Sequence, residues 1–419
     1  MRSLAVAGSL ALAATLGAAV PATAAPAAAP LRLTLPALTG PYQAGTTSLH
    51  LVDPRRKDPW VASQQRELMA TVTYPVRHSR PAPRAPWQPP GVAASTEKLG
   101  EVQLGLPPKS VDWAATQRHA RTDVPADPSL GQRPVVLFSP GYGVARETYA
   151  VLTDDLASRG YVVVSLSHTH ESAAVEFPGG RVERSMSTPG DPVEMKKAID
   201  ARVADSRFLL DQLTRLAQGD NPDAEQRPLP RHLGQALDLS RVGMFGHSYG
   251  GYTSGETMYH DSRIDAGVNL DGAMAYGFGA NGIPYLPGEV VKHGLDRPFL
   301  LFGSQLVDPA TGKPTDHNHV NPFDRSWVDF WASQRGWKRD LTIDGSRHLG
   351  YSDLQALVPQ FAQLISADKR IDLIGTVDPG RSLTAQRDFV SGFFDLHLRG
   401  FDRHLFDGPS PCYPEVKFV

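Results

Sequence analysis

Short apolar runs alternate with longer amphipathic stretches from residue 133 to well into the C-terminal third of the chain. Each run is short, rich in Val, Leu, Ile and Phe, and suited to one buried strand, whereas the stretches between them have helical character. This rhythm predicts an α/β fold in which a mostly parallel central sheet carries helices on both faces. The predicted core strands are residues 134–138, 161–165, 241–245, 264–270, 298–302 and 340–343.

Three stretches have the pattern of helices that bury one face. The longest covers residues 192–218, where apolar side chains recur at helical spacing among charges, and a shorter one lies near residues 147–159. Residues 352–365 also have one apolar face, and Pro359 should kink or shorten that helix.

The chain before residue 133 has a different character. Residues 46–52 and 68–74 resemble strands, but residues 76–132 are rich in Pro, Arg and Gly. We expect that stretch to be a surface insertion with little regular structure. Its loops, with those of residues 275–295, should shape any nearby binding site.

The first residues have the pattern of a targeting segment. A basic start is followed by an apolar stretch and by the small residues Ala22-Thr23-Ala24, which predicts a secretory signal peptide over residues 1–24 rather than a retained membrane anchor. Residues 25–40 are Ala/Pro-rich and are expected to be a linker. One α/β domain is then predicted over residues 41–419.

Composition narrows the possible partners. A net charge of −2 and the lack of a basic stripe give no indication of nucleic acid or of an anionic membrane as partner. Because Cys412 is the single cysteine, no disulfide can form within the chain, and we expect this thiol to be inert unless it pairs with another chain.

Residues 246–250 form the chain's one Gly-x-Ser-x-Gly motif, at the point where the strand ending at Phe245 meets a helix beginning near Tyr249. A serine hydroxyl is a poor nucleophile unless a tight turn lifts it towards a base and towards oxyanion donors. Glycines on both sides relieve the crowding of such a turn. This context favours Ser248 as a nucleophile over an ordinary serine in a Gly-rich turn.

His348 is the best placed base. It follows the last core strand in the short polar loop 344–348, and comes after the nucleophile and the acid candidates in chain order. Two acids compete as its partner: Asp271 ends the strand 264–270, and Asp308 follows the next strand. Their places in the chain leave both open.

Acyl transfer also needs two N–H donors for the oxyanion. One should be the amide of Tyr249, directly after the nucleophile, and the other should come from the turn 139–143. Since Pro140 has no N–H, the amide of Tyr142 is favoured there.

Four other histidines could suggest chemistry. His317 and His319, in Asp-His-Asn-His, could suggest a metal, but an exposed polar loop is the better interpretation because a third ligand is not evident. His168 and His170 follow a strand end and are expected to line the cleft without being catalytic.

With these residues in place, the sequence resembles the plasma-type (isoform II) platelet-activating factor acetylhydrolase family. The resemblance covers most of the chain after the predicted signal peptide. Its motifs are Thr39-Gly-Pro-Tyr-Gln-Ala-Gly-Thr, Leu51-Val-Asp-Pro-Arg, Thr73-Tyr-Pro75, Phe138-Ser-Pro-Gly-Tyr-Gly143, Ser167-His-Thr-His-Glu-Ser172, Gly246-His-Ser-Tyr-Gly-Gly251 and Asn269-Leu-Asp271.

The resemblance implies a secreted, calcium-independent enzyme with the α/β-hydrolase fold. In that family the acid lies a little over twenty residues beyond the serine, which favours Asp271 over Asp308. The resemblance then makes Ser248, Asp271 and His348 a catalytic triad, with Tyr142 and Tyr249 as oxyanion donors. Animal members have a histidine in place of Pro140 and an aliphatic residue in place of Tyr142, so the lip of the pocket should differ.

The expected function is therefore that of a secreted serine esterase, which cleaves short acyl esters of a phospholipid-like or small substrate through an acyl-enzyme. We expect it to need no cofactor and no metal. The alternatives are a triglyceride lipase or a cutinase-like polyester hydrolase and, from another class, a non-catalytic ligand-binding protein. Aromatic residues around Trp327, Phe330 and Trp331 could contact lipid interfaces transiently, although core packing is the more usual role. The oligomeric state stays open.

Overall fold

The computed structural model describes residues 29–77, 82–279, 282–308 and 312–419. The predicted signal peptide and the first part of the predicted linker lie outside the described residues. Over those described ranges, no helix combines the length and the apolar character that a membrane span requires.

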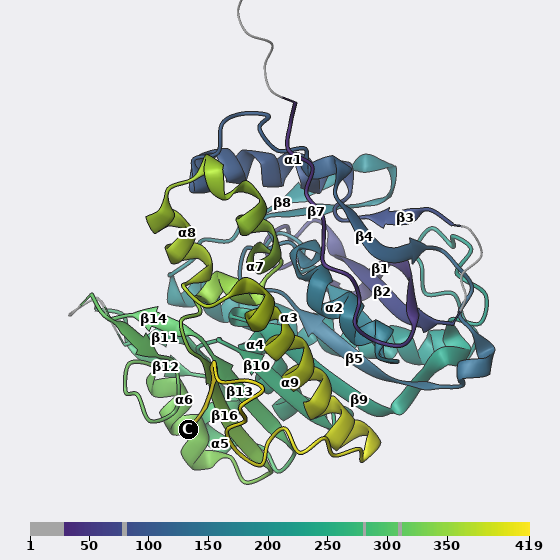
Figure 1. The fold of residues 1–419 in the computed structure, drawn as a ribbon. Coiled ribbons are helices and arrows are strands. Elements are labelled where there is room, and N and C mark those ends of the chain that lie inside the picture. The colour runs from purple at the N-terminus through teal and green to yellow at the C-terminus, as the bar shows by residue number, and fades with distance from the viewer. Residues whose placement is uncertain (1–28, 78–81, 280–281, 309–311) are drawn as a thin grey trace, which may run out of the picture.

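A central sheet of eleven strands organises the described chain (Figure 1). Its order is β17-β16-β13-β10-β9-β5-β6-β2-β1-β4-β3, and the six neighbouring strands from β16 to β6 run parallel. The strands are β1 (Gln43–Lys57), β2 (Gln65–Val76), β3 (Arg84–Pro86), β4 (Gln117–Thr122), β5 (Arg133–Ser139), β6 (Val162–Leu166), β9 (Leu237–His247), β10 (Ala266–Leu270), β13 (Phe299–Gly303), β16 (Lys338–Ile343) and β17 (Val416–Phe418). All six predicted core strands are present in this sheet, which confirms the α/β prediction.

Three two-stranded hairpins accompany the central sheet. They are β7 (Ala174–Glu176) with β8 (Val182–Arg184), β11 (Ala275–Phe278) with β12 (Tyr285–Pro287), and β14 (Gln305–Val307) with β15 (Pro314–Asp316). The last two follow β10 and β13, so they lie in the connections that leave the carboxyl ends of these strands.

Helices cover both faces of the sheet, as expected (Figure 1). They are α1 (Pro90–Leu99), α2 (Ala150–Ser158), α3 (Pro192–Ala217), α4 (Tyr249–His260), α5 (Glu289–His293), α6 (Arg325–Ser333), α7 (Leu354–Leu357), α8 (Ala367–Ile374) and α9 (Pro379–Arg399). The predicted helix over residues 352–365 is shortened to α7, and a 3-10 turn that includes Pro359 follows it, since proline cannot continue an α-helix.

The core is divided by the sheet into two layers. Val135 and Leu137 of β5 pack in one cluster with the apolar side chains of α3 and α4, while Val136 and Phe138 pack in another with those of α2 and α9. Successive side chains of a strand point to opposite faces, so one apolar strand supplies both layers. Such burial on both faces fixes the carboxyl ends of the strands, where the site is built.

The insertion 76–132 is more ordered than the sequence predicts. It contains β3, α1 and β4, and β4 pairs with β1 in the central sheet. Trp87 and Trp113 are buried in a third cluster with Phe361, which also takes in Leu33 and Leu35 from the predicted linker. The prediction was wrong because these few aromatic and aliphatic anchors hold a stretch whose Pro and Gly content indicates a loop.

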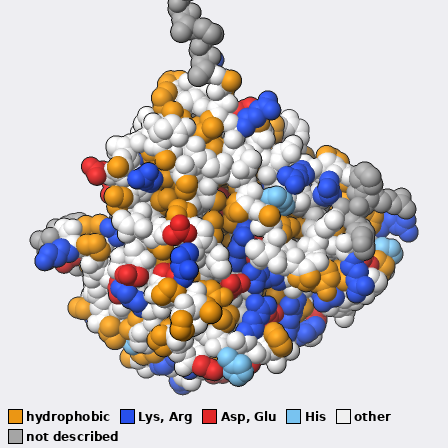
Figure 2. All heavy atoms as spheres, viewed as in Figure 1, with side chains coloured by type: hydrophobic (Ala, Val, Ile, Leu, Met, Phe, Trp, Pro, Cys, Tyr) orange, Lys and Arg blue, Asp and Glu red, His pale blue; other side chains and the backbone are white. Residues whose placement is uncertain are grey.

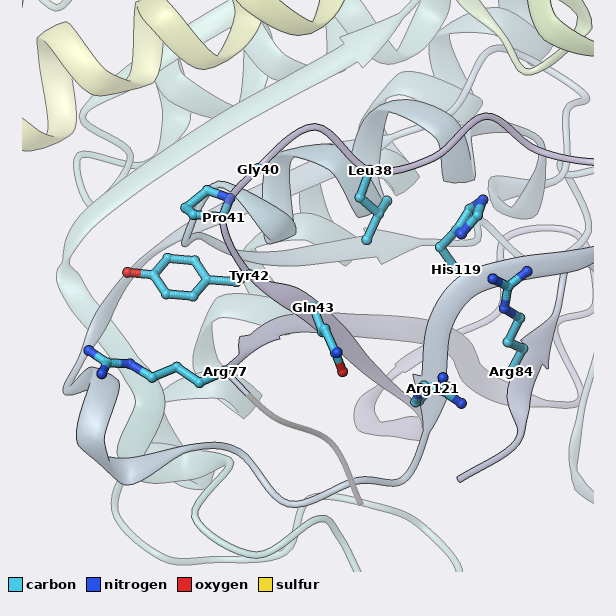
Figure 3. Close-up of a pocket in the computed structure, with 9 residues that line it drawn as sticks. All are labelled: Leu38, Gly40, Pro41, Tyr42, Gln43, Arg77, Arg84, His119 and Arg121. Atoms are coloured by element: carbon cyan, nitrogen blue, oxygen red, sulfur yellow. The ribbon is translucent and has the colours of Figure 1, made fainter. Parts of the chain in front are cut away.

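The edge of the sheet next to β1 and β4 carries an open groove of about 440 Å³. Figure 3 shows that Arg77, Arg84 and Arg121 lie around it with His119, and none of its nine lining residues is acidic. Elsewhere on the face drawn in Figure 2, basic, acidic and apolar side chains are interspersed. Ser248 and His348 do not line this groove, so it is separate from the site described next.

Candidate active site

Ser248 stands in a sharp turn between the end of β9 and the start of α4. Its backbone angles are φ 57° and ψ −126°, a strained conformation for a residue with a side chain. A Cβ added to Gly246 would lie 2.2 Å from the carbonyl oxygen of Gly250, and one added to Gly250 would lie 1.9 Å from that of Ser139. Both positions therefore require glycine, as the motif predicts.

The structure brings Ser248, His348 and Asp271 together. His348 opens the 3-10 turn His348–Tyr351 after β16, and its Nε2 lies 2.9 Å from Ser248 Oγ. Its Nδ1 donates to Asp271 Oδ2 at 2.6 Å. Asp271 directly follows β10, whereas Asp308 follows β14 in the β14–β15 hairpin. The carboxylate that orients the imidazole is thus that of Asp271.

Asp271 is fully surrounded by donors. Besides His348, Ser304 donates to both carboxylate oxygens, with its backbone N–H at 2.7 Å and its Oγ at 2.7 Å, and His317 donates at 2.8 Å. Burial by itself would raise the pKa of Asp271, but the charges and hydrogen bonds of His317 and His348 hold that pKa below its usual range. The carboxyl group therefore stays ionised at neutral pH.

His317 does not lie in an exposed loop, and that prediction was wrong. The residue is 4% exposed, and both ring nitrogens contact carboxylates, those of Asp271 and Asp324. Its ring stacks on Trp327, which is itself buried with Phe330 in the core, so these aromatics form no surface patch. Spacing gave no signal of this contact because it joins residues 46 positions apart.

The turn before Tyr142 forms the other side of the site. A Cβ added to Gly141 would lie 3.4 Å from Ser248 Cβ, so this loop packs directly against Ser248. The amide of Gly141 donates to Tyr149 Oη at 3.1 Å, and that of Gly143 donates to Glu171 at 2.6 Å. Within the described chain, the amides of Tyr142 and Tyr249 have no such acceptor, which leaves both N–H groups available to an oxyanion.

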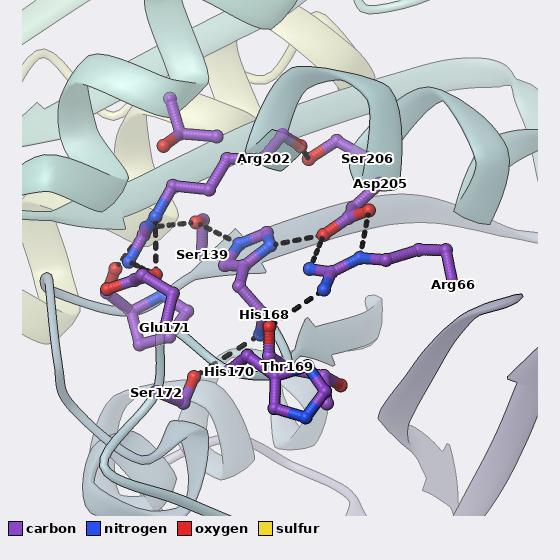
Figure 4. Close-up of polar contacts among 12 residues, drawn as sticks. Arg66, Ser139, His168, Thr169, His170, Glu171, Ser172, Arg202, Asp205 and Ser206 are labelled. Atoms are coloured by element: carbon purple, nitrogen blue, oxygen red, sulfur yellow. Dashed lines mark hydrogen bonds and ion pairs between the residues drawn. The ribbon is translucent and has the colours of Figure 1, made fainter. Parts of the chain in front are cut away.

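A buried cluster behind this loop fixes its backbone (Figure 4). Arg202 of α3 donates to the carbonyl oxygens of Pro140, at 2.7 Å, and Gly141, at 3.2 Å, and to Ser139 Oγ at 3.0 Å. It also pairs with Glu171 at 2.5 Å, and both side chains are fully buried. Through these contacts, Arg202 connects α3 to the end of β5 and to the loop that follows it.

His168 connects this cluster to a second ion pair. Its Nε2 lies 2.9 Å from Ser139 Oγ and its Nδ1 lies 3.0 Å from Asp205, which Arg66 pairs at 2.6 Å (Figure 4). Burial, followed by the charge of Arg202, lowers the pKa of His168 to about 3, so the ring is neutral. His168 and His170 were expected to line the cleft, but both are buried. Nothing in the sequence indicated a role for Arg202 or Asp205, and Glu171 stood out only as a member of the motif at residues 167–172.

Comparison with known proteins places the chain in a family. A sequence model of the family "Platelet-activating factor acetylhydrolase, isoform II" matches residues 28–279. A protein of Arthroderma benhamiae, named as a probable 1-alkyl-2-acetylglycerophosphocholine esterase, is 28% identical over 416 residues, which span 93% of this chain and 95% of that protein. The platelet-activating factor acetylhydrolase of Gallus gallus is 23% identical over 313 residues, 66% of each chain.

A solved structure agrees with this grouping. The ferulic acid esterase from Streptomyces cinnamoneus superposes with a TM-score of 0.72 at 32% identity, covering 92% of this chain and 99% of that one. These relatives are named for esterase or acetylhydrolase activity, which contradicts the alternative of a non-catalytic binding protein. The chain belongs to the platelet-activating factor acetylhydrolase, isoform II family, and is a carboxylic ester hydrolase with the α/β-hydrolase fold.

Proposed function

We propose that this protein hydrolyses short acyl esters, such as the acetyl ester of a phospholipid, through an acyl-enzyme on Ser248. His348 takes the proton of Ser248 Oγ as the oxygen attacks the ester carbonyl. The amides of Tyr142 and Tyr249 hold the resulting oxyanion. His348 then gives its proton to the leaving alcohol, and repeats the cycle with water to release the acid.

The observation that carries this proposal is the continuous hydrogen-bond chain from Ser248 Oγ through His348 to Asp271. Asp271, as a buried carboxylate, keeps the proton of the resting imidazole on Nδ1 and leaves Nε2 free to accept from the serine. Its negative charge also stabilises the imidazolium that forms when the serine is deprotonated.

The choice of substrate is supported by the family and by the Arthroderma benhamiae relative, whose name specifies a 1-alkyl-2-acetylglycerophosphocholine esterase. The alignment with that relative covers 93% of this chain and 95% of the relative. The substrate we propose is accordingly an ester with a small acyl group and a larger, phospholipid-like alcohol.

A second candidate is the hydrolysis of a hydroxycinnamoyl ester. It is favoured by the likeness to the ferulic acid esterase, which covers 92% of this chain. Such a substrate carries an aromatic acyl group, so the two candidates differ on the acyl side of the ester. Triglycerides and polyesters remain further alternatives, because the same triad serves them.

A panel of esters separates these possibilities. We would measure kcat/KM for sn-2 phospholipid and p-nitrophenyl esters from acetyl to palmitoyl, for methyl ferulate, and for a polyester film, with Ser248→Ala as control. The proposal predicts a steep fall beyond short acyl chains and no activity in the variant. A preference for methyl ferulate, for long chains or for the film would identify the corresponding alternative.

We further propose that residues 41–419 act as one catalytic domain after export, with residues 1–24 removed as a signal peptide. The pattern of the first residues supports this proposal. N-terminal sequencing of protein collected from the culture medium tests it. Material that begins near Ala25 is expected, and an uncleaved N-terminus on cell-bound protein would contradict it.

A further inference from the structure

Two histidines share the carboxylate of Asp271, and they differ in what their second nitrogen meets. His348 Nε2 faces the hydroxyl of Ser248, which can donate to a neutral ring. His317 Nδ1 lies 2.8 Å from Asp271 Oδ1, and its Nε2 lies 2.9 Å from Asp324 Oδ2. Ionised carboxylates only accept hydrogen bonds, and a neutral imidazole has one N–H. Both contacts of His317 therefore require an imidazolium.

The surroundings of His317 stabilise that positive charge. Burial would lower the pKa of His317, but the charge of Asp271 and the hydrogen bonds of Asp271 and Asp324 raise it to about 10. The ring also lies over Trp327, with centroids 4.0 Å apart and planes at 27°, which suits a cation–π contact.

The first turn of α6 holds this arrangement in place. Asp324 caps the helix by accepting from the amide of Ser326 at 2.8 Å, and Ser326 Oγ accepts from the amide of Met274 at 2.8 Å. Trp327 Nε1 donates to the carbonyl oxygen of Gly272 at 2.7 Å. The start of α6 is thus tied to the chain that directly follows Asp271.

We propose that His317 is a positioning residue of the catalytic triad, which fixes the Asp271 carboxylate and, as an imidazolium held between two carboxylates, offsets part of the negative charge that Asp271 presents to His348. This inference rests on the triad of the proposed function. It makes His317 act on catalysis through Asp271 alone, without touching the reacting atoms.

Other charges around His317 do not replace this effect. Asp324 approaches from α6 and Asp340 from β16, and both are acids. His348 contacts Asp271 directly, and two further titratable residues lie close by: His247, whose ring centroid is 4.5 Å from that of His348, and the buried Tyr351. A cation 2.8 Å from Asp271 offsets part of the negative charge that this carboxylate presents to His348.

The chain offers a matched control in His319. Its ring stacks on Trp331 with centroids 3.9 Å apart, and its Nδ1 lies 2.7 Å from the buried Asp340, but it does not contact the triad. His317→Asn keeps a donor towards Asp271 while it removes the charge and the link to Asp324. His319→Asn makes the same change two residues away.

The test is the pH profile of kcat/KM for p-nitrophenyl acetate. In His317→Asn we expect the acid limb to move up by about one pH unit, because the imidazole of His348 then meets the full charge of Asp271. In His319→Asn the acid limb should stay in place. His317→Phe, which keeps the stack but has no donor, should lose up to about a hundredfold in kcat with little change in KM, because Asp271 is no longer fixed.

An unchanged acid limb in active His317→Asn, equal to that of His319→Asn, would overturn the inference and leave His317 a packing role. Ser248→Ala and Asp271→Asn separate this failure from that of the proposed function. If both lose activity while His317→Asn behaves like His319→Asn, only the inference on His317 falls. If either keeps full activity, the triad and the inference fall together.

Discussion

Two buried polar networks support the two sides of the site, and they act through different parts of the chain. On the acid side, His317 contacts the side chain of Asp271, which in turn contacts His348. On the oxyanion side, Arg202 contacts the backbone carbonyls of Pro140 and Gly141. We expect the first network to affect the reaction through its charge, and the second to affect it through the backbone conformation of the loop 139–143.

The way each cation is neutralised explains this difference. Arg202 forms an ion pair with Glu171 at 2.5 Å. The negative charge of Glu171 therefore offsets the positive charge of Arg202. His317 shares Asp271, the acid that the proposed mechanism uses, with His348. Changes on the acid side should therefore alter the pH dependence of activity, while changes on the oxyanion side should alter the rate equally at every pH.

The largest effect is expected at Asp271. In Asp271→Asn the amide would accept poorly and hold His348 in the wrong tautomer, so kcat should fall by about 10⁴, the size of the corresponding loss in serine proteases. Steady-state kinetics with p-nitrophenyl acetate measures this loss. Asp308→Asn is the control and should stay close to the wild type; the reverse result would show that the acid is misassigned.

Arg202→Met should have the next largest effect. We expect kcat to fall by about 10²–10³, the cost of a lost oxyanion donor, because the loop that carries Tyr142 is no longer fixed. Leaving Glu171 buried without its partner should also lower the free energy of unfolding by about 3–5 kcal/mol.

The double variant Arg202→Met/Glu171→Gln distinguishes these two roles. It should recover much of the free energy of unfolding, measured in urea, but not the lost kcat, and the acid limb should stay where it is. If it also recovered the wild-type kcat, the proposed role of Arg202 in shaping the loop would be wrong.

His168 should affect stability at acid pH. Its pKa is about 3 in the folded protein and about 6.5 in an unfolded chain, so the unfolded state binds more protons between these values. The free energy of unfolding should fall as the pH drops from 6.5 towards 3, with about 1.4 kcal/mol per pH unit from this residue. Urea unfolding at pH 6 and pH 4.5 should show a weaker pH dependence in His168→Gln. An identical slope would mean that His168 is protonated in the folded state.

The smallest effect is expected for Tyr142→Phe. The proposed mechanism uses the backbone amide of this residue, and among the described residues the phenol hydroxyl forms a hydrogen bond with Ser187 alone. Losing one hydrogen bond of about 1 kcal/mol should change kcat by less than about tenfold. A loss of a hundredfold or more would show that the phenol itself takes part, and the contrast between charge and backbone would have to be revised.

Local sequence patterns predicted the core strands of the sheet and the turn that carries Ser248. Ser248 lies in a motif whose glycines and flanking strand are neighbours in the sequence, and His348 follows the last core strand. In the sequence, Asp271 and Asp308 each follow a predicted strand, so the preference for Asp271 depended mainly on the resemblance. The choice depends on which carboxyl group the folded chain brings to His348.

The supporting residues could not be found in the same way. His317 and Arg202 contact residues 46 and 61 positions away, at points where the fold brings separate strands, loops and helices together. His317 stands between the polar residues Asp316 and Asn318, which is also typical of an exposed loop, and Arg202 is one of several charged residues along α3, which is typical of a helix surface. The ordered insertion was missed for a related reason, since Trp87 and Trp113 find their partner Phe361 far along the chain.

The proposed function depends on Ser248 as the activated nucleophile of this esterase. Incubation of the folded protein with a fluorophosphonate probe, followed by mass spectrometry of its peptides, tests it most directly. We expect one adduct per chain, on Ser248, that appears as esterase activity disappears and is absent from Ser248→Ala. Loss of activity with the adduct on another residue, or full activity in Ser248→Ala, would contradict it.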